Sequence, residues 1–228
     1  MKKILRYAHK IVAKILSKHR VYIISLRCNS AKMEILCPQH DTMRLAILCL
    51  CSDEIKRKAL SGNVAELGVY RGEFASKINQ LFPDKMLYLF DTFEGFDDKD
   101  IVIESQNNFS SATDNGKEKF SNTNIDLVLK AMKYPQKCIV KQGFFPKTAE
   151  GLEDKFCFVN LDADLYEPIL QGLKFFYPRL EKGGYILIHD YNSNEYKGAK
   201  EAMCQFCKSE NITFLPLPDA GGSAIICK

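Results

Sequence analysis

The sequence has no internal repeat and no low-complexity tract, and its 13 glycines and 8 prolines are an ordinary share of 228 residues. These absences exclude a collagen-like chain and argue against a disordered or coiled-coil one. The length is sufficient for one sizeable core, and therefore for a single α/β domain with an appendage.

Acidic residues are absent from the first 30 positions, which contain eight lysines and arginines. That segment has a formal charge of +8, so the remaining 198 residues have a net charge of −4 and the whole chain +4. A mildly acidic body argues against a nucleic-acid-binding core, because neutralising phosphates needs a basic face. No nucleic-acid partner is expected.

No apolar run near the N-terminus is long enough for a secretory signal or a membrane span, because Lys10, Lys14 and Lys18 interrupt it. We therefore expect a cytoplasmic protein. Ile4, Ile11 and Ile15 share one face of a helix whose other face is basic. Two uses of this extension, residues 1–35, remain open: packing on the body or on a second copy in a homodimer, or peripheral contact of residues 1–20 with an anionic membrane.

Nine cysteines, an odd number without a visible signal peptide, favour reduced thiols over a disulfide framework. Cys204 and Cys207 have the spacing of a redox or zinc pair. They lie late in a helical pattern, however, and not at a helix N-terminus where a thiolate is stabilised. Redox or zinc use is therefore the weaker reading of this pair.

From residue 62 onward, short apolar runs alternate with segments of 3.6-residue periodicity, which predicts a parallel sheet covered by helices on both faces. The predicted strands are Val64–Leu67, Met86–Phe90, Cys138–Lys141, Phe156–Leu161 and Tyr185–His189. The chain then ends in a helix around Glu195–Lys208 and two further strands, Ile212–Leu217 and Ser223–Cys227, joined by a short reversal. This pattern predicts seven strands with the last one antiparallel.

Two other segments complete the predicted domain, residues 36–228. Asp41–Leu60 reads as a helix that Asp41 or Thr42 caps and that Ser61 and Gly62 end. Residues 92–123 form a polar stretch that is unusually long for a connection, which is typical of a lid or of an acceptor-binding loop. Surface disorder is the alternative for this stretch.

The first predicted strand ends in a turn with Glu66, Gly68 and Gly72, in the pattern E-x-G-x-x-x-G. A carboxylate at this position would repel the pyrophosphate of a dinucleotide and suits a cationic ligand. The second strand ends in Asp91, 23 positions after Gly68, where an acid can accept hydrogen bonds from ribose hydroxyls. Together, these residues predict an adenosine-type cofactor.

Four further polar residues follow the fourth and fifth predicted strands: Asp162, Asp164, His189 and Asp190. If the two strands pair, these side chains meet at one rim of the sheet. Three carboxylates so close together repel one another unless a cation neutralises them, and oxygen ligands favour a divalent ion such as Mg²⁺. The alternative is structural, with Asp164 as a helix cap and His189 hydrogen-bonded in the core.

Four segments in this order resemble the macrocin O-methyltransferase (TylF/MycF) family: Ala65–Gly72, Leu89–Phe96, Leu161–Glu167 and Gly183–Tyr191. The resemblance covers roughly residues 40–227. It implies a Rossmann-like class I methyltransferase fold that binds S-adenosylmethionine, with strand order 3-2-1-4-5-7-6. It also implies methylation of a hydroxyl of a sugar or glycosylated metabolite, assisted by Mg²⁺ or another divalent metal.

Carried over by position, the resemblance implies specific roles. The implied cofactor-binding residues are Glu66, Gly68, Tyr70, Arg71, Gly72, Asp91, Thr92, Phe93, Gly143, Phe144 and Asp162. The implied metal ligands are Asp162, His189 and Asp190, and Asp162 or Asp164 would be the general base. His189 departs from the two consecutive acids of the antibiotic-pathway members, which leaves the metal open, since imidazole suits transition metals better than Mg²⁺.

Three other functions remain open at this point. In a metal-independent methyltransferase, His189 would be the base. A protein that retains the cofactor pocket could instead serve as a non-catalytic binding partner in a glycan-assembly complex. In an NAD-linked oxidoreductase, the third reading, the Glu66 carboxylate and the terminal hairpin would be unexpected.

Overall fold

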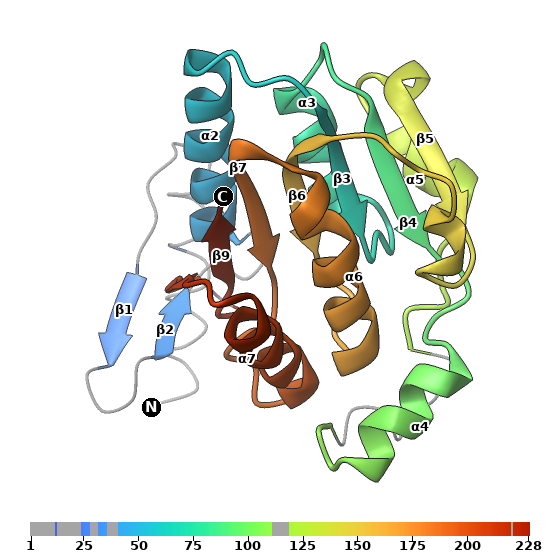
Figure 1. The fold of residues 1–228 in the computed structure, drawn as a ribbon, viewed down its shortest axis with the longest axis vertical. Coiled ribbons are helices and arrows are strands. Elements are labelled where there is room, and N and C mark those ends of the chain that lie inside the picture. The colour runs from blue at the N-terminus through green and yellow to red at the C-terminus, as the bar shows by residue number, and fades with distance from the viewer. Residues whose placement is uncertain (1–11, 13–23, 28–31, 36–40, 111–118, 220) are drawn as a thin grey trace.

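A computed structural model of the chain describes residues 12, 24–27, 32–35, 41–110, 119–219 and 221–228. Its centre is a seven-stranded sheet in the order β5-β4-β3-β6-β7-β9-β8 (Figure 1). The strands are β3 (Asn63–Leu67), β4 (Leu87–Asp91), β5 (Cys138–Gln142), β6 (Phe156–Leu161), β7 (Leu180–Ile188), β8 (Leu215–Pro216) and β9 (Ala224–Cys227). Only β9 runs antiparallel to both of its neighbours. The predicted order 3-2-1-4-5-7-6 and the antiparallel last strand are confirmed.

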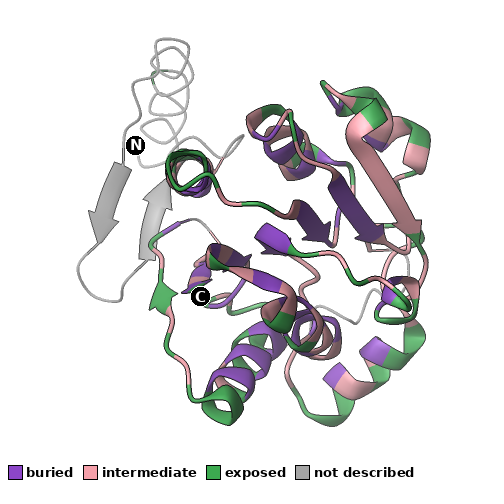
Figure 2. Ribbon diagram, turned by 45° about the horizontal axis from the view of Figure 1, so that its top comes forward, coloured by how far each residue is buried: buried purple, intermediate pink, exposed green. Residues whose placement is uncertain are grey.

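Helices cover both faces of the sheet. The helices are α2 (Thr42–Arg57), α3 (Glu73–Leu81), α4 (Asp98–Gln106), α5 (Ile125–Ala131), α6 (Tyr166–Arg179) and α7 (Lys197–Glu210), with 3₁₀ turns at Pro135–Lys137 and Lys147–Ala149. One core cluster joins the sheet to α6 and α7, and the other joins it to α2, α3 and α5. Figure 2 shows that the central strands are buried while the outer faces of the helices are exposed. The doubly wound α/β class is confirmed.

The central strands are mainly apolar because both of their faces lie under helices. All six residues of β6 are buried, although they include Asn160. The longest strand, β7, begins at Leu180 and not at Tyr185 as predicted. Its first residues, with Gly183 and Gly184, form an irregularity in the pairing with β6 that no alternation of apolar residues could reveal.

Helix α2 starts as predicted, because the Asp41 carboxylate accepts a hydrogen bond from the backbone N–H of Arg44 at 3.1 Å. The helix ends at Arg57, three residues before the predicted end. Ala59 already has a left-handed φ of 50°. The apolar Leu60 therefore belongs to the turn into the sheet and not to the helix.

The predicted N-terminal extension lies mostly outside the described residues, and among residues 1–23 only Val12 is described. The part of the extension that the structure describes includes a two-stranded antiparallel sheet, which the sequence did not predict. Its strands are β1 (Ile24–Arg27) and β2 (Lys32–Ile35). None of the described helices is both long and apolar enough to cross a bilayer. Contact with a membrane or with a second copy stays a prediction.

Residues 92–123 contain the helix α4, so this stretch is not a plain loop. The carboxylate of Glu104 accepts a hydrogen bond from the backbone N–H of Tyr166, the first residue of α6. Gly198 of α7 makes room for this contact, because a Cβ there would lie 2.1 Å from Glu104 Oε1. The anchored α4 is one wall of the cavity described below.

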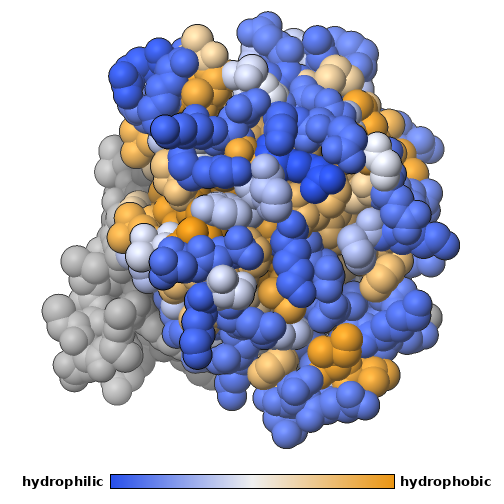
Figure 3. All heavy atoms as spheres, in the orientation of Figure 1, coloured by the Kyte–Doolittle hydropathy of each residue, from blue (hydrophilic) through white to orange (hydrophobic). Residues whose placement is uncertain are grey.

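The seven described cysteines are all free thiols, as expected for a reduced chain. Burial raises the pKa of Cys207 to about 11, so this member of the Cys204–Cys207 pair stays protonated near neutral pH. The face drawn in Figure 3 is mainly polar and charged, with apolar side chains in small separate groups. Nothing on that face resembles a large apolar docking surface.

Candidate active site

A cavity of about 670 Å³ opens at the carboxyl ends of β3, β4, β6 and β7. Its volume lies in the range of roughly 300–1,000 Å³ that is typical of small-molecule sites. Residues that we predicted from five separate segments line this one cavity: Glu66, Gly68, Tyr70, Arg71, Asp91, Thr92, Gly143, Phe144, Asp162, Asp164, His189 and Asp190. The parallel sheet thus brings the predicted site together at its carboxyl edge.

Two predicted cofactor residues, Gly72 and Phe93, are not in the wall of this cavity. Gly72 is the N-cap of α3, with φ 76°, and a Cβ there would lie 3.0 Å from the Met132 side chain. The Phe93 side chain is buried in the core cluster with α2, α3 and α5. Both residues shape the cavity through the backbone turns in which they lie.

The turn after β3 comes close to the neighbouring strand. Gly68 has φ 84°, and a Cβ there would lie 2.1 Å from the backbone oxygen of Asp162. Only glycine fits this position, because both the conformation and the space exclude a side chain. The turn therefore brings the backbone of Gly68 against the start of the β6–α6 connection.

The Asp91 carboxylate fixes this turn from the end of β4. Its Oδ2 accepts hydrogen bonds from the backbone N–H groups of Val69 at 2.6 Å and Tyr70 at 2.8 Å, and its Oδ1 accepts one from Phe93 at 2.7 Å. A carboxylate has about four acceptor sites, so capacity remains for a further donor. Asp91 thus has a structural role in the turn that sequence reasoning did not include.

Glu66 is 1% exposed and points from β3 toward the base of the cavity. Its Oε1 accepts a hydrogen bond from the Asn160 side chain at 2.8 Å, while Oε2 is buried with no hydrogen-bond partner among the described residues. Burial, together with the nearby Asp162 carboxylate, raises the pKa of Glu66 well above its ordinary value. A buried acceptor without a partner suits the ammonium group of a bound ligand.

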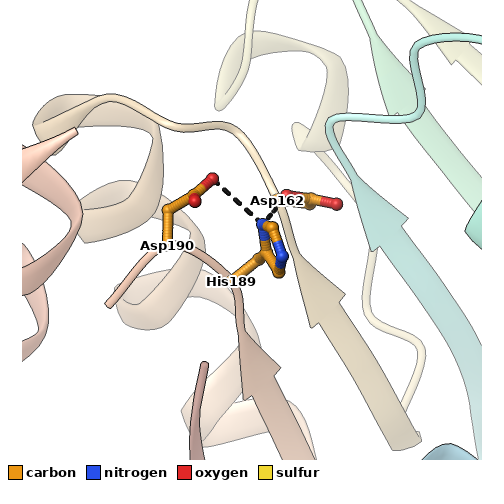
Figure 4. A group of neighbouring side chains, drawn as sticks. All are labelled: Asp162, His189 and Asp190. Carbon is orange, nitrogen blue, oxygen red and sulfur yellow. Dashed lines mark hydrogen bonds and ion pairs between the residues drawn. The ribbon is translucent and has the colours of Figure 1, made fainter. Parts of the chain in front are cut away.

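Asp162, His189 and Asp190 form the group drawn in Figure 4, in which the imidazole lies between two carboxylates. His189 Nδ1 is 3.0 Å from Asp162 Oδ1 and 3.0 Å from Asp190 Oδ2. The three residues offer one ligand atom each, all within 4.8 Å of one another. Burial lowers the pKa of His189, but the attraction of Asp162 and the two hydrogen bonds outweigh it and raise the pKa to about 10.

Arg44 belongs to this site and was missed by sequence reasoning. Its Nη2 donates hydrogen bonds to Asp162 Oδ2 at 2.8 Å and to Asn160 Oδ1 at 2.9 Å, and its guanidinium carbon lies 4.0 Å from the centre of the Phe74 ring. Burial alone would raise the pKa of Asp162, but Arg44 and His189 hold it below the ordinary value. Asp162 is therefore ionised and held from two sides.

Asp164 lies next to this group in the left-handed region, with φ 60°. It does not cap α6, whose N-cap is Leu165. Burial and the neighbouring carboxylates of Asp190 and Asp162 raise its pKa well above the ordinary value. Of the two predicted general bases, Asp164 therefore holds a proton more readily than Asp162 does.

Aromatic side chains line the cavity beyond Asp164 and Asp190. The Phe96 ring is 5.4 Å from Phe120 and 6.4 Å from Tyr196, measured between ring centroids. The Tyr196 hydroxyl is buried and has no hydrogen-bond partner among the described residues. These rings offer flat apolar surfaces, and no pattern in the sequence had assigned them to the site.

Known proteins resemble this chain in sequence and in fold. The family model described as "Macrocin-O-methyltransferase (TylF)" matches residues 39–220. Over 180 residues the chain is 22% identical to the demethyldecarbamoylnovobiocin O-methyltransferase of Streptomyces niveus. That match covers 72% of this chain and 62% of the relative's own length.

Two solved methyltransferases share the fold. The O-methyltransferase NovP superposes with a TM-score of 0.68 at 17% identity, covering 82% of this chain and 79% of its own. The calicheamicin methyltransferase CalS11 superposes with a TM-score of 0.67 at 18% identity, covering 84% of this chain and 81% of its own. An apo structure of CalS11, a TDP-rhamnose 3'-O-methyltransferase, superposes with a TM-score of 0.53 at 19% identity, covering 80% of this chain and 79% of its own. The fold is that of Rossmann-like class I methyltransferases.

Proposed function

The chain belongs to the macrocin O-methyltransferase (TylF) family of S-adenosylmethionine-dependent enzymes, and from this premise we propose that it methylates a hydroxyl group of a sugar or of a glycosylated small molecule. The acceptor class is suggested by the relatives, since CalS11 is described as acting on TDP-rhamnose. The observation that carries the proposal is the single cavity that contains both Glu66 and Asp91 at the first two strand ends and the acidic group at the next two.

The residues of the chain fit the cofactor. Bound S-adenosylmethionine supplies an electrophilic methyl group on a sulfonium. The unpaired Oε2 of Glu66 is placed to accept a hydrogen bond from the amino group of its methionine part. Asp91 is placed to accept from ribose, and the turn at Gly68, without a Cβ, lets the ligand approach the backbone.

The residues also fit a divalent ion. Two carboxylates and an imidazole within 4.8 Å of one another are a suitable donor set, with the imidazole favouring a transition metal over Mg²⁺. An ion bound there lowers the pKa of a hydroxyl that it contacts. In this proposal Asp162, His189 and Asp190 hold the ion, while Arg44 orients Asp162.

The acceptor hydroxyl must lose its proton during the transfer, and Asp162, Asp164 and His189 all lie at the same rim. Asp162 is already paired with Arg44 and His189, whereas Asp164 lines the cavity with Asp190 as its neighbour. We assign Asp164 as the proton acceptor on this placement. The alignment of acceptor oxygen, methyl carbon and sulfur is then imposed by the walls of the cavity.

A metal-independent reaction is the second candidate, and one observation favours it. His189 Nδ1 already contacts both carboxylates, so a protonated imidazole, together with Arg44 on Asp162, can neutralise them without an ion. In that state the imidazole cannot accept a proton, so His189 acts as base only after losing its own. A non-catalytic cofactor-binding protein is the third candidate.

Transfer of labelled methyl from S-adenosylmethionine to a panel of free sugars, nucleotide sugars and glycosides tests the proposal. We expect transfer to at least one acceptor class, stimulated by Mg²⁺ or Mn²⁺ and abolished by EDTA. Asp190→Ala should abolish transfer and leave the affinity for S-adenosylhomocysteine nearly unchanged. The exposed Asp126→Ala on α5 is the matched control and should behave as wild type.

The other outcomes separate the candidates. Full activity in EDTA together with an inactive His189→Ala would select the metal-independent reaction. Tight binding of the cofactor product without transfer to any acceptor would select the binding protein. Failure to bind S-adenosylhomocysteine would contradict all three.

A further inference from the structure

Asp100 on α4 is a buried acid inside the cavity that none of the roles above explains. It is 7% exposed and lines the cavity wall. Within the described part of the chain, its carboxylate has no hydrogen bond and no ion pair. Its strongest charged neighbours are the acids Asp97, Glu167 and Glu104, with Lys99 as the opposing base. A buried carboxylate among carboxylates calls for a donor from a ligand.

The position of α4 identifies the end of the cavity that Asp100 faces. The Lys99 ammonium lies 5.3 Å from the centre of the Phe144 ring, so the first turn of α4 adjoins the loop after β5. In Figure 1, α4 lies beyond the carboxyl ends of β4 and β5, on the side of the sheet away from β7. Asp100 follows Lys99 directly in the first turn of α4 and, like Gly143 and Phe144, lines the cavity.

The cofactor orientation proposed above places the base of the nucleoside at this end. Glu66 on β3 would hold the methionine part and Asp91 on β4 the ribose. The family resemblance implies that the loop after β5, with Gly143 and Phe144, borders the adenine, and β5 is the neighbour of β4 in the sheet. An acid on α4, whose first turn adjoins this loop, is then placed to meet the edge of the purine.

We propose that Asp100 accepts a hydrogen bond from the 6-amino group of the adenine and so selects an adenine nucleoside over a 6-oxopurine nucleoside. This inference rests on the proposed use of S-adenosylmethionine. An ionised carboxylate only accepts hydrogen bonds, and the 6-amino group donates them. A 6-oxo group is an acceptor, so it would face the carboxylate without a proton between them.

The test is the binding of S-adenosylhomocysteine and of its deaminated analogue, S-inosylhomocysteine, measured by calorimetry at pH 8.5 on the full chain. A hydrogen bond to a charged group predicts that the wild type prefers the adenine compound by about 10- to 100-fold. Asp100→Asn has nearly the same size and adds an N–H donor for the 6-oxo group. It should reduce the preference to about threefold or invert it, while Asp126→Asn keeps the wild-type preference.

A failure of the role of Asp100 and a failure of the proposed function give different results in this test. Equal affinity of the wild type for both compounds, or an unchanged preference in a folded Asp100→Asn, would overturn the role of Asp100 and leave the proposed function standing. No binding of either compound by the wild type would overturn both. The wild-type preference requires no variant, so a folding defect cannot obscure it.

Discussion

At the scale of single residues, the site depends on charges that are buried in pairs. Arg44 contacts Asp162, Asn160 and the Phe74 ring from a helix that lies far from them in sequence. Its removal would leave the Asp162 carboxylate without its strongest partner. The cost of breaking such a pair arises from the charge that stays buried, and not from the attraction that is lost.

We predict that Arg44→Met destabilises the protein by about 3–5 kcal/mol, measured as the free energy of unfolding in urea. The matched control is Arg57→Met on the same helix, where the guanidinium donates to Glu54 at the surface. No measurable loss is expected for the control, since exposed pairs contribute little. Equal losses in the two variants would show that Arg44 is not a buried partner of Asp162.

Asp100 should make stability depend on pH. Burial, followed by the charges of Asp97, Glu167 and Glu104 and opposed by Lys99, raises its pKa from 3.8 to about 7. Because the folded-state pKa is above the unfolded one, the contribution of this group is fully present below the unfolded pKa and is lost as pH rises through about 7.

Asp100→Asn removes that dependence. We predict that the difference in melting temperature, Asp100→Asn minus wild type, increases from pH 5 to pH 8 in the absence of ligand. Thermal unfolding followed by circular dichroism at both pH values measures it. A constant difference across this range would mean that Asp100 titrates at its ordinary pKa.

At the scale of elements, α4 is held at its junction with α6 and α7. Glu104 reaches from α4 to the first backbone N–H of α6, and the absence of a side chain at Gly198 leaves space for it. The Glu104 carboxylate caps α6, which lacks a side-chain cap of its own. Its negative charge also interacts favourably with the positive N-terminal end of the helix dipole. This contact holds α4 in place, and with it Asp100, which lines the cavity.

We predict that Glu104→Ala increases amide hydrogen exchange within residues 98–106 and lowers the stability of the whole protein by about 1 kcal/mol, the usual cost of a lost cap. The exposed Gln106→Ala in the same helix is the control and should leave exchange unchanged. If exchange of α4 were the same in both variants, the helix would be held by other contacts.

At the scale of the whole molecule, the fold followed from the sequence because a buried parallel strand must be apolar on both faces. The runs from Val64 to Tyr185 stand out against polar helix faces, so the strands and the antiparallel end could be predicted from the pattern, whereas the strand order was implied by the family resemblance. The short hairpin β1–β2 was not predicted. Apolar and polar residues do alternate in both strands, ISLR and KMEI, but four residues are too few for that alternation to distinguish a strand from a loop.

The site residues that directly follow a strand could be predicted from the sequence. Those that reach the site from a helix distant in the sequence could not. Asp162, His189 and Asp190 follow adjacent strands, and their convergence follows from parallel pairing. Arg44 is 118 positions from Asp162, and no local pattern indicates that contact. Asp100 and Glu104 read as surface acids because their burial depends on how α4 packs.

We propose that one cavity holds S-adenosylmethionine over the ends of β3 and β4, with its methyl directed at the acidic rim of β6 and β7. A crystal structure of the full chain with S-adenosylhomocysteine tests it most directly. We expect the amino group at Glu66, the ribose at Asp91, the adenine between Phe144 and Asp100, and the sulfur facing Asp162 and Asp190. A ligand bound elsewhere, or a sulfur turned away from that rim, would contradict it.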